Sequence, residues 1–147
     1  MGTLLGIARK AGKRAPMEET DAVQVSEAAG IEGDYRGKPG DRQVTVLARE
    51  AWQAVCDELG EALPWTLRRA NLLVEGVSLP RRAGDRLRVG GMLLEVTGEC
   101  DPCTRMDEQR DGLTGALRPD WRGGVTCRVI EGGAIALGDP AELLDGA

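Results

Sequence analysis

The chain has 147 residues, carries a formal net charge of −5 and contains no histidine. That length is sufficient for one domain with a substantial core, which we expect to span residues 1–147. The negative charge argues against a protein that binds nucleic acid through phosphate contacts. The absence of histidine excludes histidine-based triads, histidine general bases and nearly all familiar zinc enzyme sites, so we expect no zinc. The basic pairs Arg68-Arg69 and Arg81-Arg82 could meet a small anion, although solvated surface is the more ordinary role for the second pair.

No segment of the sequence has the pattern of a signal peptide or a membrane span. The apolar run from Leu4 to Ala8 is too short for either. We therefore expect a cytoplasmic protein that makes no membrane contact. In a reducing compartment, the four cysteines are not expected to form a disulfide framework.

The first third of the chain is predicted to form short strands separated by loops. Thr3–Arg9 is a short strand, and residues 22–26 and 43–47 alternate apolar and polar side chains as half-buried strands do. Residues 12–19 form a loop. The loop at 30–41 has four glycines and a proline in twelve residues, and it is longer than a connection needs to be. Because long loops in compact domains are often functional, we predict that this loop lines the site.

Residues 49–59 form the clearest predicted helix. Its apolar side chains recur at helical spacing, at Trp52, Val55, Cys56 and Leu59. Gly60 is suited to end the helix because glycine readily adopts the left-handed conformation. Cys56 lies on the apolar face and is therefore predicted to be a core residue.

The rest of the chain is predicted to be mostly strands. After a turn or short helix at 64–69, the predicted strands are 70–74, 86–89, 92–97, 125–130, 134–137 and 141–144. The Gly90-Gly91 pair predicts a tight hairpin turn. Residues 104–117 are predicted to be helical in pieces, broken at Gly112 and Gly115.

The whole pattern has roughly eight short strands and one clear helix. Strands at this spacing are typical of a sandwich or a barrel. Strands and helices do not alternate, which argues against a doubly wound sheet. The fold class is therefore predicted to be mainly β.

The most distinctive motif is Cys100-Asp-Pro-Cys103, which follows a predicted strand. A C-x-x-C motif can be half of a zinc site, a dithiol redox centre, or one reactive or metal-binding thiol with an incidental neighbour. A zinc site would need a second pair, whereas Cys56 and Cys127 are isolated from each other and fall on apolar faces. A helix that begins after Cys103 would stabilise a thiolate there. The motif alone fits inert turn residues equally well.

Two further groups of polar residues precede predicted strands. On an extended backbone, Arg69 and Asn71 would point to the same face, where the arginine can bind a phosphate or carboxylate. Asp41, Arg42 and Gln43 stand between the glycine-rich loop and a strand, which is a common place for binding residues.

Eight segments, in order along the chain, follow the pattern of a known family: 30–34, 41–45, 68–72, 84–90, 94–106, 121–124, 129–133 and 138–139. Together they resemble the MOSC domain, which is named for the C-terminal domain of molybdenum-cofactor sulfurase. The match runs over nearly the whole chain. The resemblance implies a β-rich, barrel-like domain with few helices.

The resemblance also implies a function connected with molybdenum. Family members with assigned roles bind the molybdenum–pterin cofactor (molybdopterin) or handle sulfur for it. Some reduce N-hydroxylated compounds at molybdenum, with electrons from partner proteins or domains. Others are proposed sulfur carriers that accept a persulfide from a pyridoxal-phosphate-dependent cysteine desulfurase. We therefore expect the molybdenum cofactor as ligand and either a desulfurase or an electron-transfer protein as partner.

The resemblance assigns roles to individual residues. Cys103 matches the cysteine after proline that marks the family, and it would carry a persulfide or bind the metal. Arg69 and Asn71 match the Arg-x-Asn that contacts the cofactor in the reductase branch. Arg42 and Gln43 fall where that branch makes further cofactor contacts.

Three hypotheses follow. In the first, the chain binds the cofactor or carries sulfur through Cys103, with Arg105 supplying a positive field and Cys100 acting as a resolving thiol. In the second, it is a reductase of N-hydroxylated compounds that needs an external electron donor. In the third, it is a non-catalytic domain with a vestigial cysteine motif. Reductase members carry a second cysteine where this chain has Met106, which favours the first hypothesis over the second.

Overall fold

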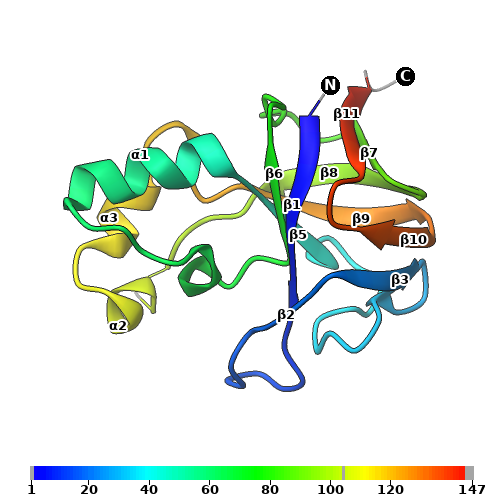
Figure 1. Cartoon of the computed structure of the whole chain (residues 1–147), viewed down its shortest axis with the longest axis horizontal. Coiled ribbons are helices and arrows are strands. Elements are labelled where there is room, and N and C mark those ends of the chain that lie inside the picture. The colour runs from blue at the N-terminus through cyan, green and yellow to red at the C-terminus, as the bar shows by residue number, and fades with distance from the viewer. Residues whose placement is uncertain (1, 104, 145–147) are drawn as a thin grey trace.

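A barrel closed by seven strands forms one side of the molecule, and a layer of helices covers part of it (Figure 1). The computed structural model describes residues 2–103 and 105–144. The barrel strands run in the order β11-β7-β8-β9-β5-β6-β1, and β1 pairs back with β11. Their bounds are β1 (Gly2–Arg9), β5 (Val44–Ala48), β6 (Leu72–Glu75), β7 (Arg86–Val89), β8 (Met92–Glu99), β9 (Val125–Glu131) and β11 (Pro140–Leu144). Neighbouring strands are antiparallel except β5 and β6, so the predicted mainly β, barrel-like fold is confirmed.

A smaller antiparallel sheet packs beside the barrel. It contains β10 (Gly133–Ala136), β3 (Ala22–Ser26) and β4 (Gly30–Ile31). The short strand β2 (Glu18–Thr20) extends the large sheet by pairing with the end of β1. The loop between β1 and β2 and the loop after β4 therefore both lie at the end of β1 that pairs with β2.

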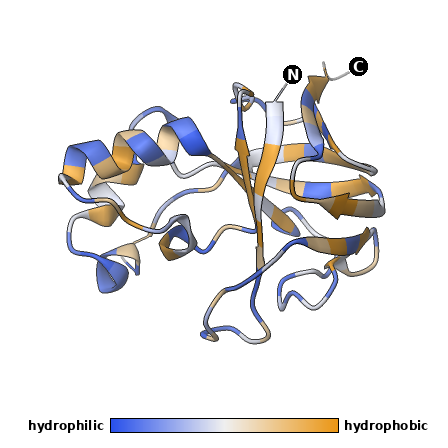
Figure 2. Ribbon diagram, viewed as in Figure 1, coloured by the Kyte–Doolittle hydropathy of each residue, from blue (hydrophilic) through white to orange (hydrophobic). Residues whose placement is uncertain are grey.

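The strand alternation divides the core into two clusters. On β5, Val44 and Val46 point into the barrel interior, whereas Leu47 points to the opposite face and joins the cluster under the helices. All seven barrel strands contribute buried apolar residues to the interior cluster, and much of their ribbon is hydrophobic (Figure 2). Thr45 lies on the same face of β5 as Leu47, at the boundary between the barrel and the helical layer.

The helical layer consists of α1 (Arg49–Leu59), η1 (Trp65–Arg68), α2 (Met106–Gln109), α3 (Leu113–Leu117) and η2 (Pro119–Trp121). The bounds predicted for α1 are confirmed, and Trp52, Val55 and Cys56 are buried as the periodicity required. Gly60 ends the helix in the left-handed conformation, with φ of 68°. α1 and α3 lie side by side on the outer side of the layer (Figure 1).

The structure differs from the predicted elements in several places, among them β4, which falls in the predicted loop at 30–41. Gly115 lies inside α3 and does not break it, because three of the other four residues of this turn, Leu113, Ala116 and Leu117, are apolar and buried against α1. β6 begins at Leu72, two residues later than predicted, because Arg69 takes a left-handed conformation. β2 falls in a segment predicted to be a loop.

Among the described residues, no helix has both the length and the apolar character needed to span a membrane.

Candidate functional site

A cavity of about 350 Å³ collects most of the residues predicted for the site. It lies where α2 and η1 face the barrel, and its size is in the range of small-molecule sites. Six predicted site residues line it: Cys100, Cys103, Arg42, Arg69, Asn71 and Arg105. Gln43, the seventh, does not.

The wall of the cavity is strongly basic although the chain as a whole is acidic. Eight basic side chains line it, against three carboxylates. The basic residues are Lys10, Lys13, Arg14, Arg36, Arg42, Arg68, Arg69 and Arg105. Low-dielectric walls and a single sign of charge concentrate the field in such a cavity. It is therefore suited to bind an anion, and arginine forks are suited to phosphate or carboxylate groups.

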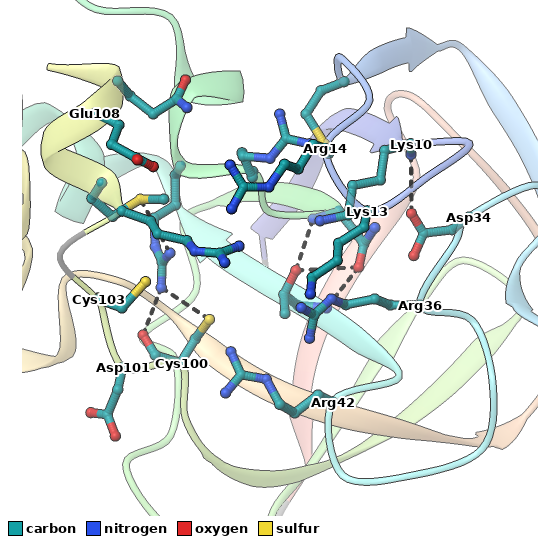
Figure 3. A pocket seen from close by; sticks show the side chains of 18 residues that line it. Lys10, Lys13, Arg14, Asp34, Arg36, Arg42, Cys100, Asp101, Cys103 and Glu108 are labelled. Atoms are coloured by element: carbon teal, nitrogen blue, oxygen red, sulfur yellow. Dashed lines mark hydrogen bonds between the residues drawn. The ribbon is translucent and has the colours of Figure 1, made fainter.

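Two loops supply the basic residues farthest from the cysteines (Figure 3). The β1–β2 loop provides Lys10, Lys13 and Arg14, and the loop after β4 provides Arg36. The two loops are joined because Lys10 donates its backbone N–H to Asp34 at 3.1 Å. The prediction that loop 30–41 lines the site is thus confirmed. The basic β1–β2 loop was not predicted to belong to it, since nothing local in the sequence indicates which loops meet.

Arg69 reaches the cavity by a different geometry from the one predicted. Its backbone is left-handed, with φ of 63°, rather than extended, and it ends η1. Its guanidinium donates a hydrogen bond to the carbonyl oxygen of Ala15, which fixes the β1–β2 loop over the cavity. Burial lowers the pKa of this guanidinium below its ordinary value.

Asn71 lines the cavity, and its side-chain amide joins β5 and β1 just before β6 begins. Its side-chain oxygen accepts hydrogen bonds from the backbone N–H of Thr45 at 3.0 Å and from the Thr45 hydroxyl at 3.2 Å. Its amide nitrogen donates to the carbonyl of Ala8 at 3.2 Å. The contacts visible here are therefore structural: Asn71 fixes β5 and β1 at the point where Arg69 enters the cavity.

Gln43 is a structural residue, contrary to its expected role as a cofactor contact. Its side chain is 2% exposed. The amide nitrogen donates to the carbonyls of Glu27 and Gly37 at 2.8 and 3.0 Å, and the amide oxygen accepts from Val129 N–H at 2.9 Å. All of these partners are backbone groups, so Gln43 ties loop 30–41 to the barrel.

Arg68 also lines the cavity, although the sequence assigned it no role at the cysteines. It is 6% exposed, and its guanidinium donates to the carbonyl of Gly123 at 3.0 Å. The same group donates to the carbonyl of Cys100 at 2.7 Å and to the Cys100 sulfur at 3.0 Å. A fourth contact, at 3.6 Å, is to the sulfur of Met106. The Arg68-Arg69 pair was a signal for an anion site, but nothing indicated that the first arginine turns inward.

The two cysteines of the motif differ in exposure. Cys103 is exposed and Cys100 is 5% exposed. Both line the cavity, and both sulfur atoms lie on its side of the loop (Figure 3). Cys103 is fixed through its carbonyl oxygen, which accepts from the Thr114 hydroxyl and the Met106 N–H, each at 2.9 Å. Thr104 lies outside the described residues.

The helix expected to start after Cys103 provides less than predicted. α2 has only four residues, and it begins at Met106. A single turn has a small macrodipole, so the positive field at the cysteines comes chiefly from arginine side chains. Arg68 contacts Cys100 directly, and Arg105 lines the cavity beside Cys103.

Besides Arg69, two titratable groups at or next to the cavity have altered pKa values. Burial lowers the pKa of the Lys10 ammonium, and the charges of Arg69 and Arg36 lower it further, against an opposite effect of Asp34. A bound anion would oppose these effects and stabilise the charged form of Lys10. Next to the cavity, burial raises the pKa of the Glu99 carboxyl, and a hydrogen bond with Asp101 raises it further.

In the described part of the chain, no group of three or more His, Cys, Asp or Glu side chains is arranged to hold a metal ion. All four cysteines are free. Cys56 and Cys127 are buried in the two core clusters, as their sequence positions predicted.

Comparison with known proteins identifies the fold family. A family model for the MOSC domain matches residues 20–142. No curated protein matches the chain significantly.

Three solved structures have similar folds. The YuaD protein from Bacillus subtilis gives a TM-score of 0.82 at 21% identity, covering 99% of this chain and 97% of that one. YiiM from Geobacillus stearothermophilus gives 0.79 at 17% identity, covering 99% and 76%, and YiiM from Escherichia coli gives 0.73 at 21%, covering 99% and 71%. At these identities the likeness concerns the fold alone. Because the family model spans well over half of the sequence, the chain belongs to the MOSC domain family.

Proposed function

We propose that the cavity binds the phosphorylated molybdenum–pterin cofactor and that Cys103 carries sulfur for it. One observation carries this proposal: eight basic side chains and an exposed thiol line one cavity in a chain of net charge −5. Membership of the MOSC family makes a molybdenum-related role the first to test.

The donor groups of the cavity fit such a ligand. Arg42 and Arg36 present guanidinium groups to the cavity, which suit a phosphate, and Lys13 adds an ammonium (Figure 3). Cys103 offers a thiol on the same wall, and molybdenum is soft enough to accept a thiolate. The described residues contain no ready set of protein ligands, so a metal would have to arrive with ligands of its own, as in an organic cofactor. When bound, the cofactor would supply a soft metal centre that exchanges sulfur.

The exposure of Cys103 favours the carrier role. A persulfide passes between proteins by attack of one thiolate on another sulfur, so the receiving thiol must be reachable. Cys103 is exposed, whereas the other three cysteines are buried. A pyridoxal-phosphate-dependent cysteine desulfurase is the expected donor. The proposal places the chain in the cytoplasm, where free thiols persist.

The structure gives the reductase alternative less support. Met106, which stands where reductase members carry a cysteine, is buried and packs its sulfur against Arg68. A thioether held in this way is a weak replacement for a thiolate ligand.

The test is cofactor loading in vivo. The chain is purified anaerobically from a host with intact cofactor synthesis, and bound molybdenum and phosphorylated pterin are measured by metal analysis and by fluorescence after oxidation. The expected result is both components in the wild type, with lower loading in Lys13→Ala/Arg36→Ala and unchanged loading in the surface control Arg88→Ala. Absence of both components from the wild type would refute cofactor binding.

The sulfur-carrier part has its own readout. After incubation with a cysteine desulfurase and cysteine, mass spectrometry should find a persulfide on Cys103 of the wild type and none in Cys103→Ser. A wild type that stays unlabelled would refute the carrier role and leave cofactor binding to be judged by its own test.

A further inference from the structure

We propose that Cys100 is the resolving thiol for a sulfur adduct on Cys103 and that Arg68 is the positioning residue that holds Cys100 for this step. The inference rests on the proposed function only in naming the natural adduct, which would be a persulfide. The pairing of the two thiols rests on the structure itself.

The first observation is the division of exposure between the two thiols. Cys103 is exposed, so a sulfur donor can reach it from solvent, whereas Cys100 is 5% exposed and cannot be reached in the same way. Both nevertheless line the same cavity, three residues apart, with their sulfur atoms on its side of the loop (Figure 3). Because exchange rates depend on access, an accessible thiol takes up the adduct, and a shielded thiol in the same cavity is suited to resolve it within the protein.

The second observation is the contact of Arg68 with Cys100. The Arg68 guanidinium donates to both the sulfur and the carbonyl of Cys100, at 3.0 and 2.7 Å, so it fixes the side chain and the backbone together. Among the described residues, no carboxylate forms an ion pair with Arg68 within 4 Å, although its charge also acts on the Glu99 carboxyl. A buried guanidinium whose direct partners are carbonyls and sulfur atoms favours negative charge on the sulfur that it contacts.

The third observation concerns what keeps this contact in place. Gly123 lies against it: a Cβ on Gly123 would stand 2.7 Å from the Cys100 carbonyl oxygen and 3.0 Å from an Arg68 nitrogen. The carbonyl of Gly123 is itself a partner of Arg68. Residue 123 therefore has no room for a side chain without displacing Arg68 or Cys100.

The other two cysteines do not fit the resolving role. Cys127 is fully buried in the barrel cluster and does not line the cavity. Burial also raises the pKa of its thiol, which disfavours the reactive thiolate. Cys56 is buried in the cluster under the helices and does not line the cavity.

The resolving step balances without an external oxidant. Cys103 begins as a persulfide. The thiolate of Cys100 attacks the inner sulfur, Cys103 Sγ, and a bond forms between the two Sγ atoms. The bond to the outer sulfur breaks, and this sulfur leaves with the electron pair as hydrosulfide. The outer sulfur is reduced and the two cysteines are oxidised to a disulfide, which a dithiol reductant must open before the next cycle.

An aromatic disulfide tests the pairing independently of persulfides. Native protein is treated with dithiobis(nitrobenzoate), and the release of thionitrobenzoate is followed together with the mass of the product. In the wild type, the reaction of Cys103 with the reagent should release one equivalent of thionitrobenzoate. Attack of Cys100 on the resulting mixed disulfide should release a second equivalent and leave an internal Cys100–Cys103 disulfide with no adduct. Cys100→Ser should release one equivalent and keep the adduct on Cys103, and Cys56→Ser should behave as the wild type. A wild type that keeps an adduct, or that links Cys100 to Cys127, would overturn the proposal.

The role of Arg68 is read from the second phase of release. Arg68→Met should slow that phase at least about tenfold while leaving the first phase unchanged, and Arg68→Lys should restore part of the rate. An unchanged second phase in a folded Arg68→Met protein would refute the positioning role. Should Arg68→Met fail to fold, Gly123→Ala gives the same readout, with the same slow second phase expected.

Inorganic tetrasulfide then connects the pairing with the proposed function. Wild-type protein should release hydrosulfide and become two hydrogens lighter, whereas Cys100→Ser should remain one sulfur heavier. If the aromatic disulfide experiment succeeds but neither protein takes up sulfur, the carrier function fails and the thiol pairing stands. If Cys100→Ser releases hydrosulfide as fast as the wild type, the resolving role fails.

Discussion

Arg42 and Gln43 are neighbours in the chain but belong to different parts of the structure. Arg42 is exposed and lines the basic cavity, whereas Gln43 is 2% exposed and hydrogen-bonded to three backbone groups. Both residues stand in the turn before β5, which begins at Val44, and the hydrogen bonds of Gln43 hold its side chain inward while Arg42 stays exposed. One residue is therefore available to a ligand, and the other holds the loop that surrounds the ligand.

Replacing Gln43 should weaken the fold. Gln43→Ala leaves the carbonyls of Glu27 and Gly37 and the N–H of Val129 without their partner, so we expect a loss of about 1–3 kcal/mol in the free energy of unfolding. Urea denaturation measures this loss, and hydrogen exchange should show faster exchange in loop 30–41. A variant as stable as the wild type would contradict the structural role of the residue.

Replacing Arg42 should weaken anion binding without affecting the fold. For Arg42→Ala we expect the affinity for inorganic phosphate, measured calorimetrically at low salt, to fall by about 0.5–1 kcal/mol. The urea midpoint should stay within about 0.5 kcal/mol of the wild type. Arg88→Ala is the control, because Arg88 pairs with Glu131 and does not line the cavity. Equal losses in the two variants would show that net charge, and not the cavity, sets the affinity.

Anion affinity should fall at alkaline pH because of Lys10. The pKa of Lys10 lies below the ordinary lysine value of 10.5, chiefly through burial, so its ammonium is lost at a lower pH than usual. A bound anion interacts favourably with the charged ammonium of Lys10. Anion binding therefore weakens as pH rises through this lowered pKa. A phosphate titration across the alkaline range measures the decline. Lys10→Arg should reduce it, since arginine stays charged, and an identical decline in that variant would assign the effect to another group.

Alanine substitution should change the stability of the fold in opposite directions at Gly123 and Gly115. Gly123→Ala should destabilise the fold by about 1–3 kcal/mol, because the added methyl group meets the Cys100 carbonyl and Arg68. Gly115→Ala should stabilise it by about 0.5–1 kcal/mol, since the position is helical and no atom lies within 4 Å of an added Cβ. Thermal unfolding of both variants measures the difference. A neutral Gly123→Ala would show that the Arg68–Cys100 contact tolerates displacement.

The sequence predicts elements whose pattern is long enough to be distinctive. α1 has two full turns of apolar spacing and a glycine at its end, and its bounds were correctly predicted. β2 was missed because Glu18–Thr20 is short and polar, and it exists as a strand only through pairing with the end of β1. Local propensity carries no information about such a pairing.

The candidate site likewise contains residues that the sequence predicts and residues whose place depends on tertiary contacts. The cysteine motif, Arg42, Arg69 and the glycine-rich loop could be found from the sequence, because each stands beside a predicted strand. The inward turn of Arg68 could not, since it depends on η1 ending in a left-handed Arg69. The meeting of the β1–β2 loop with loop 30–41 depends on tertiary hydrogen bonds, among them that of Lys10 N–H with Asp34.

The central claim is that this cavity recognises a phosphorylated pterin through its basic wall. The most direct measurement is a calorimetric titration of the wild type and of Lys13→Ala/Arg36→Ala with a phosphorylated pterin and with the same pterin after phosphatase treatment. Each pair of charge-assisted hydrogen bonds to phosphate is worth about 1.5–3 kcal/mol or more, so the wild type should prefer the phosphorylated form by at least about tenfold, and the variant should lose most of this preference. Equal affinity of the wild type for both forms would contradict the claim.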